Sequence, residues 1–221
     1  MYRELAPDTA LAGRVACVWT HLATSSSTQL VVPDGCVDLI WGPDGPHVAG
    51  PDTGPMPVRM APGDRYSGIR FRPGAVGEVF GVPVEALRDA RVPLAELGVL
   101  PSLTPWTMQK ELAVRLRETP DPDPAAPAIA EALRAGRSVG QVAWDLGLGE
   151  RQLHRRSLRA FGYGPKTLQR VVRFQRALRL ARDGVAAAEV ALASGYADQS
   201  HMANEVRRLA GVSLGRLLGH S

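Results

Sequence analysis

A repeat in the C-terminal half constrains the fold of this chain more than any other feature of the sequence. Residues 142–148 (VAWDLGL) line up with residues 190–196 (VALASGY) at an offset of 48, and Leu153 lines up with Met202 at an offset of 49. Each copy has the pattern of a helix, a glycine turn, and a second helix that is apolar on one side and polar on the other. A helix that lies in a DNA groove needs two such unlike sides, and the turn before it needs a small residue. The repeat therefore predicts two helix-turn-helix units.

The segments around the repeat predict an all-helical C-terminal part. Helical periodicity indicates helices over residues 125–135, 139–146, 150–161 and 166–183. The last of these has 18 residues, which gives a length of about 27 Å at the rise of an α-helix. Successive major grooves on one face of DNA lie about 34 Å apart, so one rigid helix with a turn at each end sets that spacing within a single chain. Two unequal recognition helices, the second helices of the two units, predict an asymmetric DNA site.

Positive charge is concentrated between the two units. From Gly149 to Arg182 the chain has ten basic side chains and a single acid, Glu150. A stable solvent-facing helix normally mixes the two signs, so like charges at this density predict a polyanion that offsets their repulsion. Nearly all are arginine, whose planar fork suits phosphates and guanine edges. A solvated basic surface is the alternative. The ten are Arg151, Arg155, Arg156, Arg159, Lys166, Arg170, Arg173, Arg176, Arg179 and Arg182.

Residues 125–218 resemble the DNA-binding domain of AraC/XylS-type transcription regulators. The likeness rests on residues 195–202 (GYADQSHM), on residues 211–213 (GVS), and on residues 162–165 (GYGP), which match the turn after the first unit. The resemblance implies seven helices, with two helix-turn-helix units joined by a long central helix. It also implies base contacts from positions beside the buried apolar residue of each recognition helix. Those positions are Arg151, His154 and Arg155 in the first unit, and Gln199, Ser200, His201 and Asn204 in the second.

Phosphate contacts are expected from six further basic residues of the same region, namely Arg156, Arg159, Lys166, Arg170, Arg173 and Arg176. The sequence also departs from the family pattern. Ser157 stands where a packing aromatic is usual, Asn204 stands where arginine is common, and residues 214–215 (LG) replace a Ser-Pro type of turn. Acidic residues occur among the basic residues of the second recognition helix, so the first unit is expected to dominate the affinity for DNA. Trp144 is expected to be structural rather than to stack on a base.

A proline-rich stretch divides the chain. Residues 118–127 contain four prolines, which disfavour helix and predict a linker or stiff elbow. The charge balance changes at the same place, because residues 1–120 carry 11 basic and 13 acidic side chains while residues 121–221 carry 15 and 9. The predicted domains are therefore residues 1–117 and 128–221, on either side of the linker at 118–127. The overall fold class is α+β.

The N-terminal part is expected to be a small β-rich α+β domain. Alternation of apolar and polar residues predicts strands over residues 14–22, 36–41 and 66–72. The Gly/Pro-dense residues 42–55 predict turns. Short helices are expected over residues 74–80, 84–89 and 94–97, and a longer one over residues 106–117. This last helix is also the best candidate for a homodimer contact.

A sensing role for this domain is expected from its likeness to a poorly characterised domain found in a subset of these regulators. The likeness rests on residues 32–41 (VPDGCVDLIW) and 68–74 (GIRFRPG). The candidate effector residues are Cys36, Asp38, Trp41, Arg70 and Arg72. An anionic effector near the two arginines is one alternative, and surface salt bridges are another.

Other chemistry at this motif stays open. Cys36 and Asp38 with His47 offer too few ligands to predict a metal site, so no metal or other cofactor is expected. A reactive Cys36 needs a lowered thiol pKa, for which Arg70 or Arg72 is the available cation. The chain has no Gly-x-Ser-x-Gly elbow, phosphate loop, dinucleotide fingerprint or His-Glu-x-x-His motif. The expectation is therefore a protein that is not an enzyme.

The sequence as a whole predicts a sequence-specific regulator of transcription that binds double-stranded DNA and responds to a small-molecule or other signal. RNA polymerase is a further candidate partner. The alternatives are a thiol-reactive sensor or repair-type enzyme that uses Cys36, and a non-specific DNA-binding protein. No secretory signal or membrane-spanning run is evident at the N-terminus, so a soluble cytoplasmic protein is expected.

Overall fold

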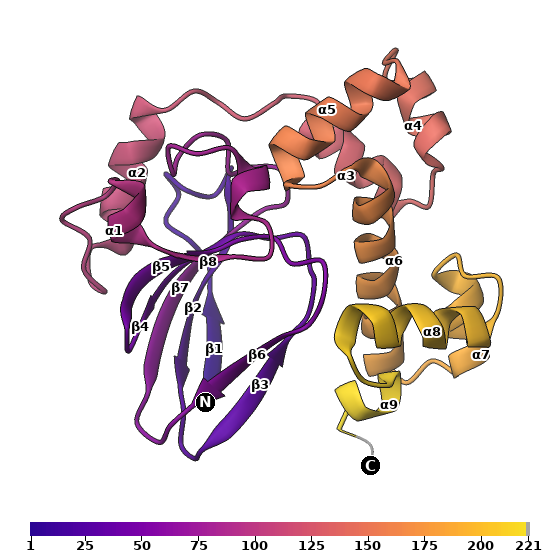
Figure 1. Ribbon diagram of the computed structural model, residues 1–221, viewed down its shortest axis with the longest axis horizontal. Helices are drawn as coiled ribbons and strands as arrows, with labels where there is room; N and C mark the ends of the chain where they lie inside the picture. Colours follow the sequence, from indigo (N-terminus) through magenta and orange to yellow (C-terminus); the bar gives the residue numbers. More distant parts are fainter. Residues whose placement is uncertain (220–221) are drawn as a thin grey trace.

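The computed structural model describes residues 1–219, and it has a strand-rich N-terminal part beside a helical C-terminal part (Figure 1). Six antiparallel strands form one sheet in the order β1-β2-β7-β4-β5-β8, and β3 and β6 form a separate two-stranded ribbon. The α+β fold class predicted from the sequence is confirmed. The strands are β1 (Tyr2–Leu5), β2 (Val15–Leu22), β3 (Ser27–Val31), β4 (Asp38–Gly42), β5 (Gly45–Ala49), β6 (Met56–Met60), β7 (Arg65–Phe71) and β8 (Arg91–Pro93).

The N-terminal core forms where the apolar faces of the central strands meet short helices. Leu39, Ile69 and Phe71 are fully buried there, and Phe71 packs edge-on against Phe80 with ring centroids 5.7 Å apart. Leu112 closes the core from the longest helix of this part. Those helices are the 3-10 helix η1 (Val84–Leu87), α1 (Leu94–Leu97) and α2 (Met108–Glu118).

Several sequence predictions for this part are wrong. Residues 42–55 were expected to be turns, but they contain β5, because the hairpin from β4 needs only the two loop residues Pro43 and Asp44. Residues 74–80 were expected to be helical, but they form turns, since Gly74 and Gly77 both have positive φ, which no right-handed helix contains. The expected helix at 84–89 is the shorter η1. Strands β1, β3, β6 and β8 lie at sheet edges or in the ribbon and were missed.

The four C-terminal helices for which the sequence predicts ranges begin and end within one residue of those ranges. The seven described helices here are α3 (Ala126–Arg134), α4 (Val139–Asp145), α5 (Glu150–Phe161), α6 (Pro165–Arg182), α7 (Ala187–Ala193), α8 (Gln199–Ala210) and α9 (Leu214–Leu217). Two apolar clusters hold them together, one for each helix-turn-helix unit. Leu168 and Val171 of α6 belong to the first cluster, whereas Phe174 and Leu178 of the same helix belong to the second. The single helix α6 therefore joins the two units.

Local signals explain where these helices begin. Ser138 accepts the backbone N–H of Gln141 while the Gln141 side chain accepts the N–H of Ser138, which is a capping box at the start of α4. Asp198 accepts the backbone N–H of His201 at the start of α8. Pro165 begins α6, where a missing N–H costs nothing.

The N-terminal part packs directly against both helix-turn-helix units. A Cβ added at Gly162, at the end of α5, would lie 2.7 Å from Cγ of Pro51, and one added at Gly74 would lie 2.7 Å from the ring of Phe161. Val32 packs against the apolar cluster of the second unit. Residues 119–125 link α2 to α3 (Figure 1). The two parts also contact each other at the residues named above. Within residues 1–219, no helix combines the length and the apolar character that a membrane crossing needs.

Candidate nucleic-acid interface

The two recognition helices, α5 and α8, have matching inner and outer faces. In α5 the buried positions are Leu153, Ser157, Ala160 and Phe161. The buried positions of α8 follow the same spacing, 49 residues later, and are Met202, Val206, Leu209 and Ala210. Each helix therefore uses one side for its own unit and leaves the other side free. All seven candidate base-contact residues, Arg151, His154, Arg155, Gln199, Ser200, His201 and Asn204, are exposed.

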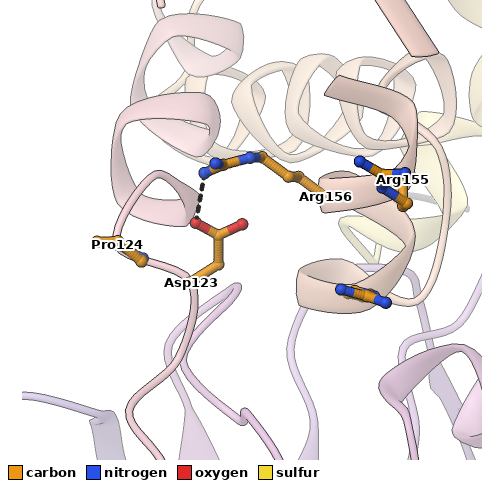
Figure 2. Close-up of a pocket in the computed structure, with 5 residues that line it drawn as sticks. Asp123, Pro124, Arg155 and Arg156 are labelled. Carbon is orange, nitrogen blue, oxygen red and sulfur yellow. Dashed lines mark hydrogen bonds and ion pairs between the residues drawn. The ribbon is translucent and has the colours of Figure 1, made fainter. Parts of the chain in front are cut away.

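A pocket lies on each flank of α5. The first, of about 300 Å³, is lined by Arg155, Arg156 and Arg159 together with Asp123 and Pro124 (Figure 2). The second, of about 600 Å³, lies toward the start of α6, and its lining includes Arg151, His154 and Lys166. A helix in a major groove has a phosphate strand on each side. Basic hollows on both sides of the exposed face of α5 suit that geometry.

Two of the candidate phosphate contacts are also held by ion pairs within the protein. Arg156 donates from Nη1 to Oδ1 of Asp123 at 2.9 Å, and Arg170 donates from Nε to Oε2 of Glu205 at 2.8 Å. Both acids come from outside the run of ten bases, so part of the repulsion expected from the sequence is offset without a polyanion. The salt bridges found among residues 1–219 include no partner for Arg159, Lys166 or Arg176.

Arg173 supports the second unit from α6. Its guanidinium lies over the ring of Tyr196, 5.1 Å from the centroid, and donates to the carbonyl of Gly195 at 3.3 Å. Burial raises the pKa of Tyr196 to about 12, although the nearby Arg173 acts in the opposite direction. The ring of His201 meets Tyr196 edge-on, and its Nδ1 accepts the backbone N–H of Ala197. Arg173 and His201 therefore help to shape the turn before α8.

Trp144 and Ser157, both in the first unit, differ in burial. Trp144 was expected to be structural, but its side chain is 86% exposed, because the buried residues of α4 are Val142 and Ala143 and the next position points outward. Ser157, which stands where a packing aromatic is usual in the family, also belongs to this unit. It is fully buried, and its hydroxyl has no hydrogen-bond partner among the described residues.

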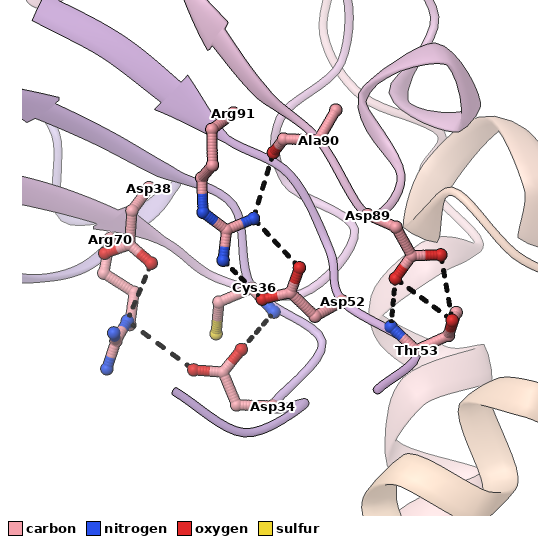
Figure 3. Close-up of polar contacts among 9 residues, drawn as sticks. All are labelled: Asp34, Cys36, Asp38, Asp52, Thr53, Arg70, Asp89, Ala90 and Arg91. Atoms are coloured by element: carbon pink, nitrogen blue, oxygen red, sulfur yellow. Dashed lines mark hydrogen bonds and ion pairs between the residues drawn. The ribbon is translucent and has the colours of Figure 1, made fainter. Parts of the chain in front are cut away.

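In the N-terminal part, the structure gathers three of the five candidate effector residues in one polar cluster (Figure 3). Asp38 is buried, and its carboxylate accepts from Nε1 of Trp19 at 2.7 Å and from Nε of Arg70 at 3.2 Å. Asp34 lies 3.7 Å from the same Arg70 nitrogen and accepts the backbone N–H of Cys36. Trp19 and Asp34 are not among the effector residues expected from the sequence, although Asp34 stands in the Pro-Asp-Gly turn of the quoted motif.

The other two candidates lie apart from this cluster. Trp41 packs against the apolar core, and Arg72 donates to the carbonyl of Ala12 at the surface. Burial raises the pKa of the Asp38 carboxyl to about 6, and it outweighs the opposing effect of Arg70. Burial also raises the pKa of the Cys36 thiol well above its ordinary value, with Asp34 acting in the same direction. This direction is opposite to the lowered thiol pKa that a reactive Cys36 requires. No trio of potential metal ligands occurs in the part of the chain that the structure describes.

Two family models match separate parts of the chain. Residues 142–219 match the model of a helix-turn-helix domain family, and residues 3–93 match the model of a domain of unknown function, DUF6597. Among solved structures, the fold resembles ToxT from Vibrio cholerae, with 10% identity, a TM-score of 0.52, and coverage of 91% of this chain and 97% of that one. A probable AraC family transcriptional regulator from Rhodopseudomonas palustris is 23% identical over 44% of this chain and 96% of its own, with a TM-score of 0.38. No curated protein sequence matches the chain.

Proposed function

We infer that this chain is a DNA-binding transcription regulator, in which an AraC-type helix-turn-helix domain follows a DUF6597 domain. It recognises one specific double-stranded sequence and responds to a signal at its N-terminal domain. The observation that carries the inference is the pair of matched recognition helices, α5 and α8. They pack with the first and second halves of α6, and their candidate contact residues are exposed. The two helices present different side chains, so the DNA site is asymmetric.

Selection of bound duplexes from a random oligonucleotide pool tests the specificity. A specific regulator enriches one asymmetric site and prefers it to random DNA by about 10³-fold or more. Binding to both should weaken steeply with salt, since arginine–phosphate contacts release counterions. A pool that stays random while the protein binds tightly would replace this proposal with that of a non-specific DNA-binding protein.

Signal control is supported by the contacts between the two parts. Nε2 of Gln175, on α6, donates to the carbonyl of Pro33 at 2.6 Å. Tyr163, just before α6, lies against Gly35, where an added Cβ would be 3.3 Å from the tyrosine oxygen. The Pro-Asp-Gly turn therefore touches the helix that joins the two units, while its Asp34 faces Arg70 of the polar cluster.

A ligand that displaced Asp34 from Arg70 would move this turn and change how the N-terminal part holds the two units. Cys36, Asp38 and Arg70 stay the candidate effector residues within that route. Arg70→Ala should alter DNA affinity or the response to signal although Arg70 lies in the other domain. Unchanged DNA binding and unchanged transcription in that variant would contradict the route. A homodimer through residues 106–117, and contact with RNA polymerase, stay predictions.

A further inference from the structure

The pocket beside α5 combines three guanidinium groups with one carboxylate. Arg155 and Arg159 are exposed, one turn apart on α5, and no salt bridge is found for either within residues 1–219. Arg156, between them, pairs with Asp123 of the segment that links the two domains (Figure 2). The pocket therefore has an excess of positive charge, and its volume of about 300 Å³ has room for a phosphate group. Arginine forks bind phosphate oxygens in a bidentate manner.

Asp123 accepts two hydrogen bonds beside the pocket. Its Oδ1 accepts Arg156 at 2.9 Å and also accepts the backbone N–H of Ala125 at 2.9 Å, in the turn that leads into α3. A phosphate that engages Arg156 would compete with this carboxylate for the same guanidinium. The competition would take place in the short segment between α2 and α3, where the two domains are joined.

The second unit is built differently. Glu205 occupies the position in α8 that Arg156 occupies in α5, 49 residues earlier, and it pairs with Arg170 of α6. The two ion pairs thus have opposite polarity. The side chain that projects from the recognition helix is a cation in the first unit and an anion in the second. Among the described salt bridges, an internal carboxylate therefore holds a recognition-helix arginine in the first unit and not in the second.

We propose that Arg156 and Arg159, in the pocket that Arg155 also lines, bind a phosphate group, and that Asp123 is a built-in competitor that weakens this binding. The inference rests on the proposed function, because the ligand is either a phosphodiester of the DNA backbone or a free phosphate anion. Since the competitor belongs to the linking segment, a movement of the N-terminal domain that withdraws Asp123 would increase the affinity of the first unit.

The test compares Asp123→Asn with Asp121→Asn in the full chain. Asparagine at position 123 keeps an oxygen to accept the Ala125 N–H, so α3 should stay intact and the melting temperature should not change. Asp121 provides the same charge change in the same segment, but it acts on Arg14 rather than on the pocket. Asp123→Asn should bind both a selected duplex and a random one about 3- to 10-fold more tightly, because a sequence-independent phosphate contact gains equally on both. Asp121→Asn should change the affinity less than about twofold.

Calorimetry with inorganic pyrophosphate separates the two sources of phosphate. Tighter DNA binding without pyrophosphate binding assigns the pocket to the DNA backbone, whereas tighter pyrophosphate binding with unchanged DNA affinity assigns it to a free anion. Arg159→Ala should reverse either gain. Equal behaviour of the two asparagine variants in both assays would overturn the proposal while leaving specific DNA binding intact. If the unaltered protein binds no DNA sequence specifically, that result instead contradicts the proposed function.

Discussion

Trp144 and Leu192 occupy the same position in the two helix-turn-helix units, and both side chains extend into solvent, with exposures of 86% and 69%. Each follows a pair of buried residues on the first helix of its unit, Val142 and Ala143 in α4 and Val190 and Ala191 in α7. The repeated buried pair places the next side chain outward both times. Trp144 is therefore not part of the core, although it follows two buried apolar residues.

Replacing Trp144 should cost little stability. Trp144→Ala is expected to change the free energy of unfolding by less than about 0.5 kcal/mol, since an exposed side chain leaves no cavity. Phe161→Ala is the contrasting change, because this ring is 1% exposed, and its removal should cost about 3–5 kcal/mol. Urea denaturation measures both. A large loss for Trp144→Ala would show that the side chain is packed in solution.

The equivalent exposed positions Arg155 and Asn204 should contribute unequally to recognition. Arg155→Ala should lose discrimination at one base pair, with a cost of about 1–3 kcal/mol by analogy with bidentate arginine–guanine contacts. Asn204→Ala should cost less. The measurement is the affinity of each variant for a panel of single-base variants of the selected site. An unaltered site preference for Arg155→Ala would remove Arg155 from the contact residues.

The interface at Tyr163 should tolerate loss of its hydroxyl. Tyr163 is buried, and its oxygen has no hydrogen-bond partner among the described residues. Tyr163→Phe should therefore leave stability unchanged or raise it by about 1 kcal/mol, because no buried polar group remains unsatisfied. Thermal unfolding of the full chain measures this difference.

Gly35→Ala tests the other side of the same contact. Gly35 has a φ of +82°, and an added Cβ would lie 3.3 Å from the Tyr163 oxygen, so the change should destabilise the chain by about 1 kcal/mol or more. Combining it with Tyr163→Phe should recover part of the loss, since the nearest atom is then gone. Strict additivity of the two changes would mean that these residues do not touch.

The Asp38 carboxyl should titrate near pH 6, because burial raises its pKa from 3.8 to about 6. Between about pH 4 and pH 6, the folded protein keeps a proton on Asp38 that the unfolded chain has already released. The stability contributed by this group is thus greatest below about pH 4 and falls as the pH rises through 6. Asp38→Asn should lack this part of the pH dependence. NMR of the labelled carboxyl gives the pKa directly, and a value near 4 would refute the prediction.

The Cys36 thiol should react slowly. Since burial raises its pKa well above the ordinary range, little thiolate exists at neutral pH, and alkylation should be slower than that of a free thiol. Denaturant should restore the rate. Cys17→Ser provides a protein with one cysteine, so that the rate belongs to Cys36 alone. Rapid alkylation of the folded protein would revive the thiol-reactive alternative.

Local pattern was sufficient to predict the helical half of this protein. The repeat, the glycine stops and the 3.6-residue periodicity act within a few residues, and α4, α5 and α6 accordingly lie where the sequence predicts them. The candidate base-contact residues were implied by the resemblance to AraC/XylS-type regulators, and all of them are exposed. Strands such as β1 and β8 were missed because an edge strand depends on a neighbour elsewhere in the chain more than on its own alternation.

Only the tertiary structure decided which polar groups from distant segments contact each other. Arg156 finds Asp123 33 residues away, Arg170 finds Glu205 35 residues away, and Gln175 finds the carbonyl of Pro33 across 142 residues. Sequence spacing sets which side of a helix a residue occupies, but it does not determine which distant segment packs against that side. The two DNA-binding units were therefore evident from the order of residues alone, whereas the contacts that hold them against the N-terminal domain follow from the packing of segments far apart in the chain.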